Sequence, residues 1–321
     1  MLTRRSLALA SAAVPLAAPA VLAQTRYPLS SVTLVTHSSP GGGSDVFLRE
    51  LIKHLGPVMG VSFAVENVRG GSGATAVARV ARAQPNGGMF YATTPTYIQT
   101  TLLSRPEFGY DSLDPLSVVF LDPQLIYTRA QSPFQTLGEA MAAARATPGR
   151  QKWGAANPAS LERIALERLN RLVGARAAVV PHEGGGDLMI NVLNGTLDIG
   201  IGEIQEIGAQ LEAGRIRLLG VLTESRLETI PALATAGEQG IDLVVAKFRG
   251  LAGPKGMPDE IAAQWSAALA TVLASPAYRE IYAKESLVAT PQLLPRPAAR
   301  AFTTAFAADI ATSLRELGVV R

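Results

Sequence analysis

The sequence predicts an α/β fold organised in two domains, and three observations lead to this prediction. Short apolar runs alternate with amphipathic helical patterns along most of the chain. Its 321 residues, of which 48% are hydrophobic, are enough for one large or two medium domains. Three apolar runs lead into glycine clusters at residues 37–45, 67–73 and 182–187, each followed by a helical pattern. These clusters therefore mark strand-to-helix junctions.

The N-terminal segment, residues 1–23, is predicted to be an export signal peptide. Arg4 and Arg5 provide a basic start, an alanine-rich apolar run follows over 7–22, and small residues allow cleavage near Ala23. The run is shorter than the roughly 20 residues of a membrane-spanning helix. The arginine pair leaves both the general and the twin-arginine export routes open. The mature protein is therefore expected in the periplasm.

The first part of the mature chain is predicted to alternate strands with helices. Strands are expected at 32–36, 63–65 and 89–92, and helices at 45–55 and 74–83. Two further strands, at 118–121 and 126–128, are separated by Asp122 and Pro123. Because proline cannot donate to a strand ladder, we interpret this interruption as the first crossing between the domains.

The middle of the chain repeats this plan. Strands are expected at 153–155, 177–180, 197–201 and 216–222, with helices at 136–146, after 157 and at 187–193. In the helix after residue 157, Asn157 is expected to be the N-cap, with Pro158 in the first turn. Glu162 falls on the exposed face of that helix.

The chain is predicted to cross back to the first domain at residues 248–250. From 258 onward it is predicted to be helical, with breaks near 275–276 and 291–297 and a last long helix at 299–317. The expected first lobe therefore comprises 24–122 and 249–321, and the second lobe comprises 123–248.

Composition excludes several classes of function. The net charge is +3, and removal of the two signal-peptide arginines would leave the mature chain nearly balanced. Nucleic-acid binding is therefore disfavoured, because it requires clustered Lys and Arg. The absence of cysteine excludes thiolate metal sites and cysteine nucleophiles. No metal or cofactor is expected, since His37 and His182 lack the local spacing of metal ligands.

The glycine junctions predict a cleft that holds a small anion. Glycine lets the backbone approach a ligand closely, and the helix start behind it offers unpaired N–H groups with partial positive charge. No phosphate-loop or dinucleotide fingerprint is present, which argues against a nucleotide. His37 and His182 both end strands just before glycine clusters, so both are expected to face this cleft.

Several polar side chains are candidates to complete the cleft. Thr93 and Thr94 follow a strand end, where their hydroxyls could donate to an anion or cap a helix. Arg249 lies at the second crossing and is predicted to clamp a carboxylate, with a weak surface ion pair as the alternative. Glu203 would repel an anion, so it requires a partner cation, a bridging water, or a hydroxyl or amine on the ligand.

Taken in order, these segments resemble the extracytoplasmic solute receptors of tripartite tricarboxylate transporters, also called the Bug family. The matching segments are 40–45, 65–67 with 70–73, the Thr-rich loop 93–96, 183–187, and 248–250 with 253–256. The glycine cluster 183–187 and residues 248–250 look closest to the tricarboxylate-receptor branch. The resemblance implies a type II periplasmic-binding-protein fold, in which two α/β lobes with two crossovers close on a small carboxylate.

The resemblance also implies which residues contact the ligand. By similarity, backbone N–H groups and hydroxyls that bind the solute fall on Ser38, Ser39, Gly42, Gly70, Gly71, Ser72, Thr93, Thr94, Asn157, Ser160, Gly184 and Gly185. This chain departs from many members at three places. Those members carry a small apolar stretch in place of residues 37–39, an Asp-Asn pair near Gly202 and Glu203, and a Trp in place of Phe248.

The predicted function is that of a monomeric periplasmic receptor, without enzymatic activity, that captures a small carboxylate. It would deliver the solute to the membrane subunits of a tripartite transporter. One alternative is an exported serine hydrolase, because residues 70–74 approximate a nucleophile elbow around Ser72. The other alternative is an orphan receptor that feeds a signalling system.

Overall fold

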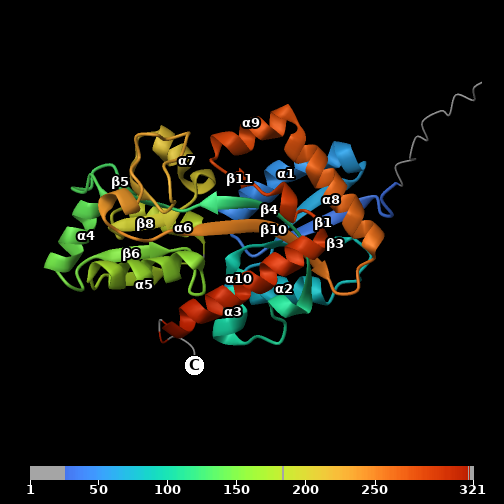
Figure 1. The fold of residues 1–321 in the computed structure, drawn as a ribbon, viewed down its shortest axis with the longest axis horizontal. Coiled ribbons are helices and arrows are strands. Elements are labelled where there is room, and N and C mark those ends of the chain that lie inside the picture. The colour runs from blue at the N-terminus through green and yellow to red at the C-terminus, as the bar shows by residue number, and fades with distance from the viewer. Residues whose placement is uncertain (1–25, 183, 317, 319–321) are drawn as a thin grey trace, which may run out of the picture.

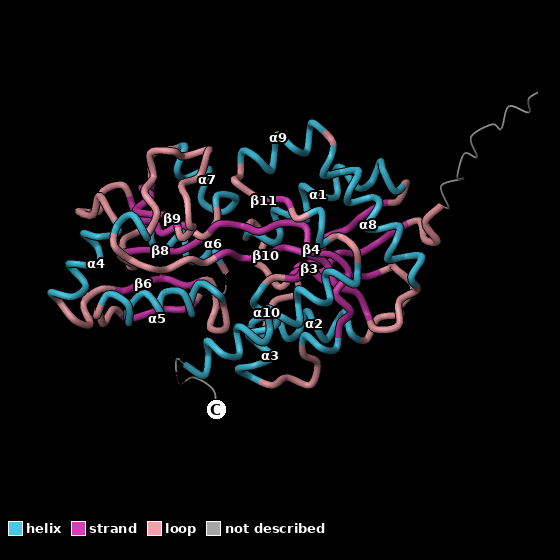
Figure 2. The backbone as a smooth tube through the Cα atoms, viewed as in Figure 1, coloured by secondary structure: helices cyan, strands magenta, loops and turns pink. Residues whose placement is uncertain are grey.

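The computed structural model describes residues 26–182, 184–316 and 318. Two lobes lie side by side, and each is a β-sheet flanked by helices (Figure 1). The strands β4 and β10 run between the two lobes (Figure 2). The expected signal peptide, 1–23, and residue 183 lie outside the described residues. Within the described ranges, no helix has the length and apolar character required to cross a membrane.

The first lobe is built on a six-stranded sheet with the order β11-β4-β10-β3-β1-β2. Its strands are β1 (Ser31–Thr36), β2 (Ser62–Asn67), β3 (Met89–Thr93), β4 (Leu113–Pro123), β10 (Ala246–Pro254) and β11 (Val288–Ala289). Strand β1 pairs in parallel with β2 and β3, whereas β10 is antiparallel to β3 and β4. The carboxyl ends of β1, β2 and β3 therefore meet at one edge of this sheet.

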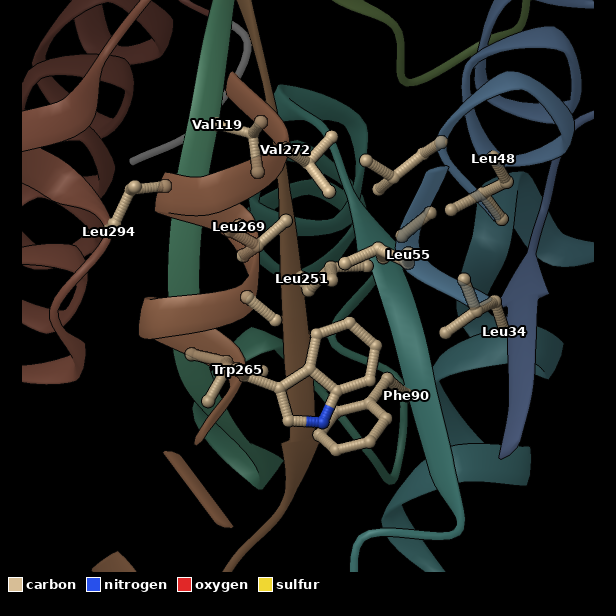
Figure 3. Close-up of a cluster of buried hydrophobic side chains, with 14 of the residues drawn as sticks. Leu34, Leu48, Leu55, Phe90, Val119, Leu251, Trp265, Leu269, Val272 and Leu294 are labelled. Atoms are coloured by element: carbon tan, nitrogen blue, oxygen red, sulfur yellow. The ribbon is translucent and has the colours of Figure 1, made fainter. Parts of the chain in front are cut away.

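Helices cover both faces of the first sheet. They are α1 (Gly43–Met59), α2 (Ala74–Ala81), α3 (Pro95–Ser104), α8 (Asp259–Ala274), α9 (Pro276–Lys284) and α10 (Arg296–Glu316). The core between α1, α8 and the sheet contains Leu48, Phe90 and Trp265 (Figure 3). The indole of Trp265 lies with its ring centroid 4.6 Å from that of Phe90. Burial of large apolar side chains holds this layer together.

The second lobe is built on a five-stranded sheet with the order β7-β6-β8-β5-β9. Its strands are β5 (Leu125–Arg129), β6 (Lys152–Ala155), β7 (Ala178–Pro181), β8 (Ile199–Gly202) and β9 (Ile216–Val221). Its helices are α4 (Leu137–Ala146), α5 (Leu161–Val173), α6 (Gly185–Leu193) and α7 (Ile204–Glu212). Its core also takes in Ile310 and Leu314 near the end of α10. The last helix therefore connects the cores of both lobes.

Most of the expected strands and helices are found, and two helices were missed. Helix α3 follows the Thr-rich loop, and α7 follows Glu203. Strands β4 and β10 are also longer than expected.

The expected start of α5 is wrong. The helix begins at Leu161, and its N-cap is Ser160, whose hydroxyl accepts from the N–H of Arg163 at 3.1 Å. Asn157 instead accepts from the N–H of Ala159 at 3.2 Å, in the turn before the helix. Ser160, whose side chain caps a helix as well as that of Asn157, is thus the N-cap.

The expected exposure of Glu162 is also wrong, because its side chain is 1% exposed. A lysine from β10 reaches into the interior and pairs with it, as described below.

Candidate functional site

The first and third glycine junctions meet where the two lobes touch. The loop before α1 belongs to the first lobe, and the loop before α6 belongs to the second. A Cβ on Gly184 would lie 2.6 Å from Oγ of Ser39, so the two backbones come together here because Gly184 lacks a side chain. Ser39 is 7% exposed. The lobes are therefore closed on one another at this point.

The second junction lies beside the first. A Cβ on Gly73 would be 3.3 Å from Cβ of His37. Four successive residues have positive φ here, from Gly70 to Gly73, and one of them is Ser72 with φ 51°. The Ser72 carbonyl accepts from the hydroxyl of Thr100 at 2.7 Å, which helps to hold this strained turn.

His37 is a neutral imidazole at this junction. Its Nδ1 lies 2.7 Å from the hydroxyl of Tyr91. Burial, with smaller contributions from Lys247 and Arg249, lowers the pKa of His37 to about 3. The ring therefore offers hydrogen bonds but no charge near pH 7.

A carboxylate already lies at the start of α1, and it belongs to the protein. The N–H of Gly43 donates to Oε1 of Glu206 at 2.6 Å, which joins α1 of the first lobe to α7 of the second. A Cβ on Gly185 would lie 2.5 Å from Cδ of Glu206, and one on Gly202 would lie 3.2 Å from its Oε2. Glycines of both lobes thus leave room for this carboxylate, as predicted for an anion at helix starts.

Buried charged side chains connect β4 and β10 to the second lobe, and we call them the hinge cluster. It consists of Asp122, Glu162, Glu203, Lys247 and Arg249. Lys247 Nζ lies 2.6 Å from Oε1 of Glu162 and 2.7 Å from Oε1 of Glu203. Arg249 Nε lies 2.6 Å from Oδ2 of Asp122. Because residues two apart on a strand share a face, both cations of β10 point the same way.

The hinge cluster shifts the pKa values of its members in opposite directions. Burial raises the pKa of Asp122 to about 7 even though Arg249 opposes the shift. Burial opposes ionisation of Glu203 as well, but Lys247 and Arg249 outweigh it and lower the pKa to about 2. Gln124 also donates to Oε1 of Glu203 at 2.9 Å. Glu203 is therefore the ionised centre of the cluster, with the cations that the sequence indicated it would need.

Arg249 is buried, so the alternative of a surface ion pair is wrong. Its side chain is 0% exposed, and its Nη2 lies 3.4 Å from Oε2 of Glu203. Nη2 also approaches the first glycine junction, since a Cβ on Gly43 would lie 2.5 Å from it. Among the described residues, this Nη2 and Oε2 of Glu203 have no hydrogen-bond partner. Both atoms therefore lie near the start of α1, and each can still form a hydrogen bond.

The remaining predicted residues differ in how they are placed. Thr94 is 1% exposed, and within the described part of the chain its hydroxyl has no hydrogen-bond partner. His182 instead turns back on its own strand, with Nδ1 3.1 Å from the carbonyl of Val180. The side chains of Ser160 and Asn157 are hydrogen-bonded at and before the start of α5, as described above.

Across the described ranges, no three His, Asp or Glu side chains lie together as a metal ion requires.

Sequence reasoning missed Glu206, Lys247 and Glu162. Glu206 lies one helical turn after Glu203, a spacing that places both on the same side of α7 once that helix is recognised. Lys247 lies two residues before Arg249 on a strand. Both spacings are visible in the sequence, but each indicates a shared face only when the helix or the strand has been recognised.

Comparison with known proteins shows the family of this chain. The family model described as "Tripartite tricarboxylate transporter family receptor" matches residues 47–291. This chain belongs to that family. The resemblance seen in the sequence is therefore confirmed, and with it the role of a solute receptor.

Curated members of this receptor family are distant relatives of the chain. It is 26% identical over 283 residues to "UPF0065 protein in the TAR-I ttuE-ttuC' intergenic region" of Agrobacterium vitis, covering 86% of the chain and 81% of the relative. It is 24% identical to protein BugT of Bordetella pertussis, covering 83% of the chain and 84% of the relative.

Solved structures confirm the two-lobed fold of the receptor. The periplasmic binding protein BugD superposes with a TM-score of 0.86 at 23% identity, covering 92% of this chain and 99% of that one. Rpa4515 of R. palustris, solved with adipate, superposes with a TM-score of 0.85 at 25% identity and the same coverage. MatC of Rhodopseudomonas palustris, solved with malate, has a TM-score of 0.82 at 23% identity, covering 90% of this chain and 100% of that one.

Proposed function

We propose that this protein captures a small carboxylate between its two lobes in the periplasm and delivers it to the membrane subunits of a tripartite transporter. The observation that carries the proposal is the bond between the N–H of Gly43 and a carboxylate at the meeting point of both lobes. It marks a place where a helix start and glycines of both lobes accept a carboxylate. The adipate carried by Rpa4515 is consistent with a solute of this class.

The proposal includes the processing and organisation of the chain. Cleavage near Ala23 releases a monomer that requires no cofactor and performs no chemistry. One lobe comprises 24–122 with 249–321, the other comprises 123–248, and the two crossings form the hinge between them. The second sheet draws its strands from residues 125–221, which fits this division.

The ligand contacts that we propose come from both sides of the cleft. The first lobe contributes Ser38, Ser39, Gly42, Gly70, Gly71, Ser72, Thr93 and Thr94, and the second contributes Gly184 and Gly185. Arg249 acts on the ligand through the α1 start that its Nη2 faces. We also propose contacts from Asn157, Ser160 and His182.

A thermal-shift screen of mono-, di- and tricarboxylates on the mature protein tests this function. A ligand that binds only the folded state stabilises it by about 2.7 kcal/mol at a hundredfold excess over Kd, so at least one acid is expected to raise the melting temperature. If no acid in the screen changes the melting temperature, the carboxylate function is wrong.

A matched pair of serine variants then tests the site. Loss of a hydrogen bond to the charged carboxylate in Ser39→Ala is expected to weaken binding of the best acid roughly 12- to 160-fold. Ser225→Ala, on an exposed loop, is the control and should bind like the wild type. Equal affinities of all three proteins would place the ligand elsewhere.

A further inference from the structure

Glu206 occupies the place where a receptor for simple carboxylates would receive its ligand. Its carboxylate reaches from the first turn of α7 across to α1 and accepts from the N–H of Gly43. Gly185 at the start of α6 and Gly202 at the end of β8 surround it on the second lobe. The anion that these helix starts attract is thus supplied by the chain itself.

Glu206 forms no ion pair with a Lys or Arg side chain of the described residues, although Lys247 and Arg249 lie near it. The two cations of β10 are already engaged, Lys247 with Glu162 and Glu203, and Arg249 with Asp122 and Glu203. Adding Glu206 gives four carboxyl groups for two cations. A ligand that brought a further bare carboxylate to this place would therefore enter a site where carboxyl groups already outnumber cations.

The ionisable groups that face Glu206 agree with this excess. They are Glu203 on its own helix, Glu162 of α5, Lys247 and Arg249 of β10, and Tyr127 of β5. Burial, followed by the charge of Glu203, raises the pKa of Glu206 to about 8. Without ligand, Glu206 is therefore mostly protonated at pH 7.

A second acceptor points to the same place. Oε2 of Glu203, on a side chain that is 0% exposed, has no hydrogen-bond partner among the described residues. It lies 3.1 Å from the position of a Cβ on Gly43, next to the N–H that Glu206 accepts. An ammonium group carries three donors and one positive charge, which suits two neighbouring carboxylate oxygens. The buried hydroxyl of Thr94 remains as a donor for an anion.

We infer that the solute is an amino carboxylate, whose protonated amine binds Glu206 while its carboxylate binds the donors of the glycine junctions. This inference rests on the proposed function and specifies its ligand class. Glu206 is the specificity-determining residue. It distinguishes a zwitterion from a plain acid by charge and not by size.

Isothermal titration with matched pairs tests the inference. Each pair has one carbon skeleton with and without the amine, such as aspartate with succinate, glutamate with glutarate, and 6-aminohexanoate with hexanoate. At pH 7.4, at least one amino acid is expected to bind the mature protein ten times or more as tightly as its partner. Glu206→Gln should weaken binding of that amino acid at least tenfold, because charge-assisted hydrogen bonds are the strong ones.

Glu212→Gln is the control, since Glu212 lies on the same helix with its side chain 72% exposed. It should retain the wild-type preference. Melting curves of both variants verify that they fold.

Proton exchange provides a measurement on the wild type alone. An ammonium beside Glu206 lowers its pKa, so binding should release a proton, seen as a dependence of the titration heat on the buffer's ionisation enthalpy. Uptake of a proton by a preferred plain acid would overturn the inference while leaving the carboxylate function intact. So would an amine preference that survives Glu206→Gln. Failure of every acid and amino acid to bind would overturn both proposals.

Discussion

At the scale of residues, the site depends on carboxylates that are buried and unequal. Glu203 is ionised because it pairs with two cations, whereas Glu206, one turn further along α7, forms no ion pair with a Lys or Arg of the described residues. Two glutamates at the start of one helix thus have very different pKa values, about 2 for Glu203 and about 8 for Glu206. Their environments, and not their residue type, decide which one remains charged.

The raised pKa of Glu206 predicts how stability depends on pH. The usual value for glutamate is near 4.5 and the folded value is about 8, so between these pH values the folded state binds more protons than the unfolded state. Stability should therefore decrease with rising pH through this group, by at most about 1.4 kcal/mol per pH unit. Glu206→Gln removes this contribution, and its melting temperature should gain on the wild type between pH 5 and pH 8.

Glu212→Gln is again the matched control, and its difference from the wild type should stay constant over this pH range. A constant difference for Glu206→Gln as well would mean that Glu206 titrates near its ordinary value.

At the scale of elements, β10 ties the crossing between the lobes to two helices of the second lobe. Lys247 joins the strand to α5 through Glu162 and to the start of α7 through Glu203. Arg249 joins the same strand to β4 through Asp122. The two cations that alternate along this strand therefore form an internal connection in the fold.

Removal of one partner from this connection should be costly. Lys247→Met leaves Glu162 buried without its cation and Glu203 with Arg249 alone. Breaking a buried pair in this way costs about 3–5 kcal/mol. Lys284→Met is the comparison, because Lys284 forms an exposed pair with Glu212 at 3.6 Å, worth about 1 kcal/mol or less. Urea unfolding of both variants measures the difference. Similar losses for the two would show that the hinge cluster is solvated.

At the scale of the whole molecule, the two lobes share strands, a helix and a closed contact. Strands β4 and β10 run between the lobes (Figure 1), and α10 packs Ala299 and Ala307 on the first lobe and Leu314 on the second. The cleft closes where Gly184 meets Ser39. Any separation of the lobes at this contact would therefore have to bend β4 and β10 or detach α10 from one of the lobes.

A side chain on Gly184 should prevent closure without unfolding the protein. Gly184 has φ 170°, an extended conformation that any residue adopts, so the fold itself does not require glycine there. In Gly184→Val the new side chain would meet Ser39, and affinity for the best solute should decrease at least tenfold while the melting temperature without solute stays nearly unchanged.

Adding Ser39→Gly to this variant removes the opposing side chain and should restore part of the affinity. A Gly184→Val protein that binds normally would show that this contact is unnecessary for binding.

Much of the fold could be predicted from the sequence, because apolar period and glycine placement are local signals. The strands before the glycine junctions were located in this way. The start of α5 was misplaced because Asn157 and Ser160 both suit an N-cap, and local chemistry does not choose between them. Helix α7 was missed, and Glu206 was missed with it.

The sequence by itself determined the alternation of strands and helices, the three junctions suited to an anion, and the resemblance that identified the family. The tertiary structure alone decided which groups face one another at these junctions. Glu206 comes from a helix of one lobe and Gly43 from a helix start of the other, 163 residues apart. Charges that are distant in sequence interact strongly only when folding brings them together away from water. For that reason, the residue that fills the anion site became visible only in the closed fold.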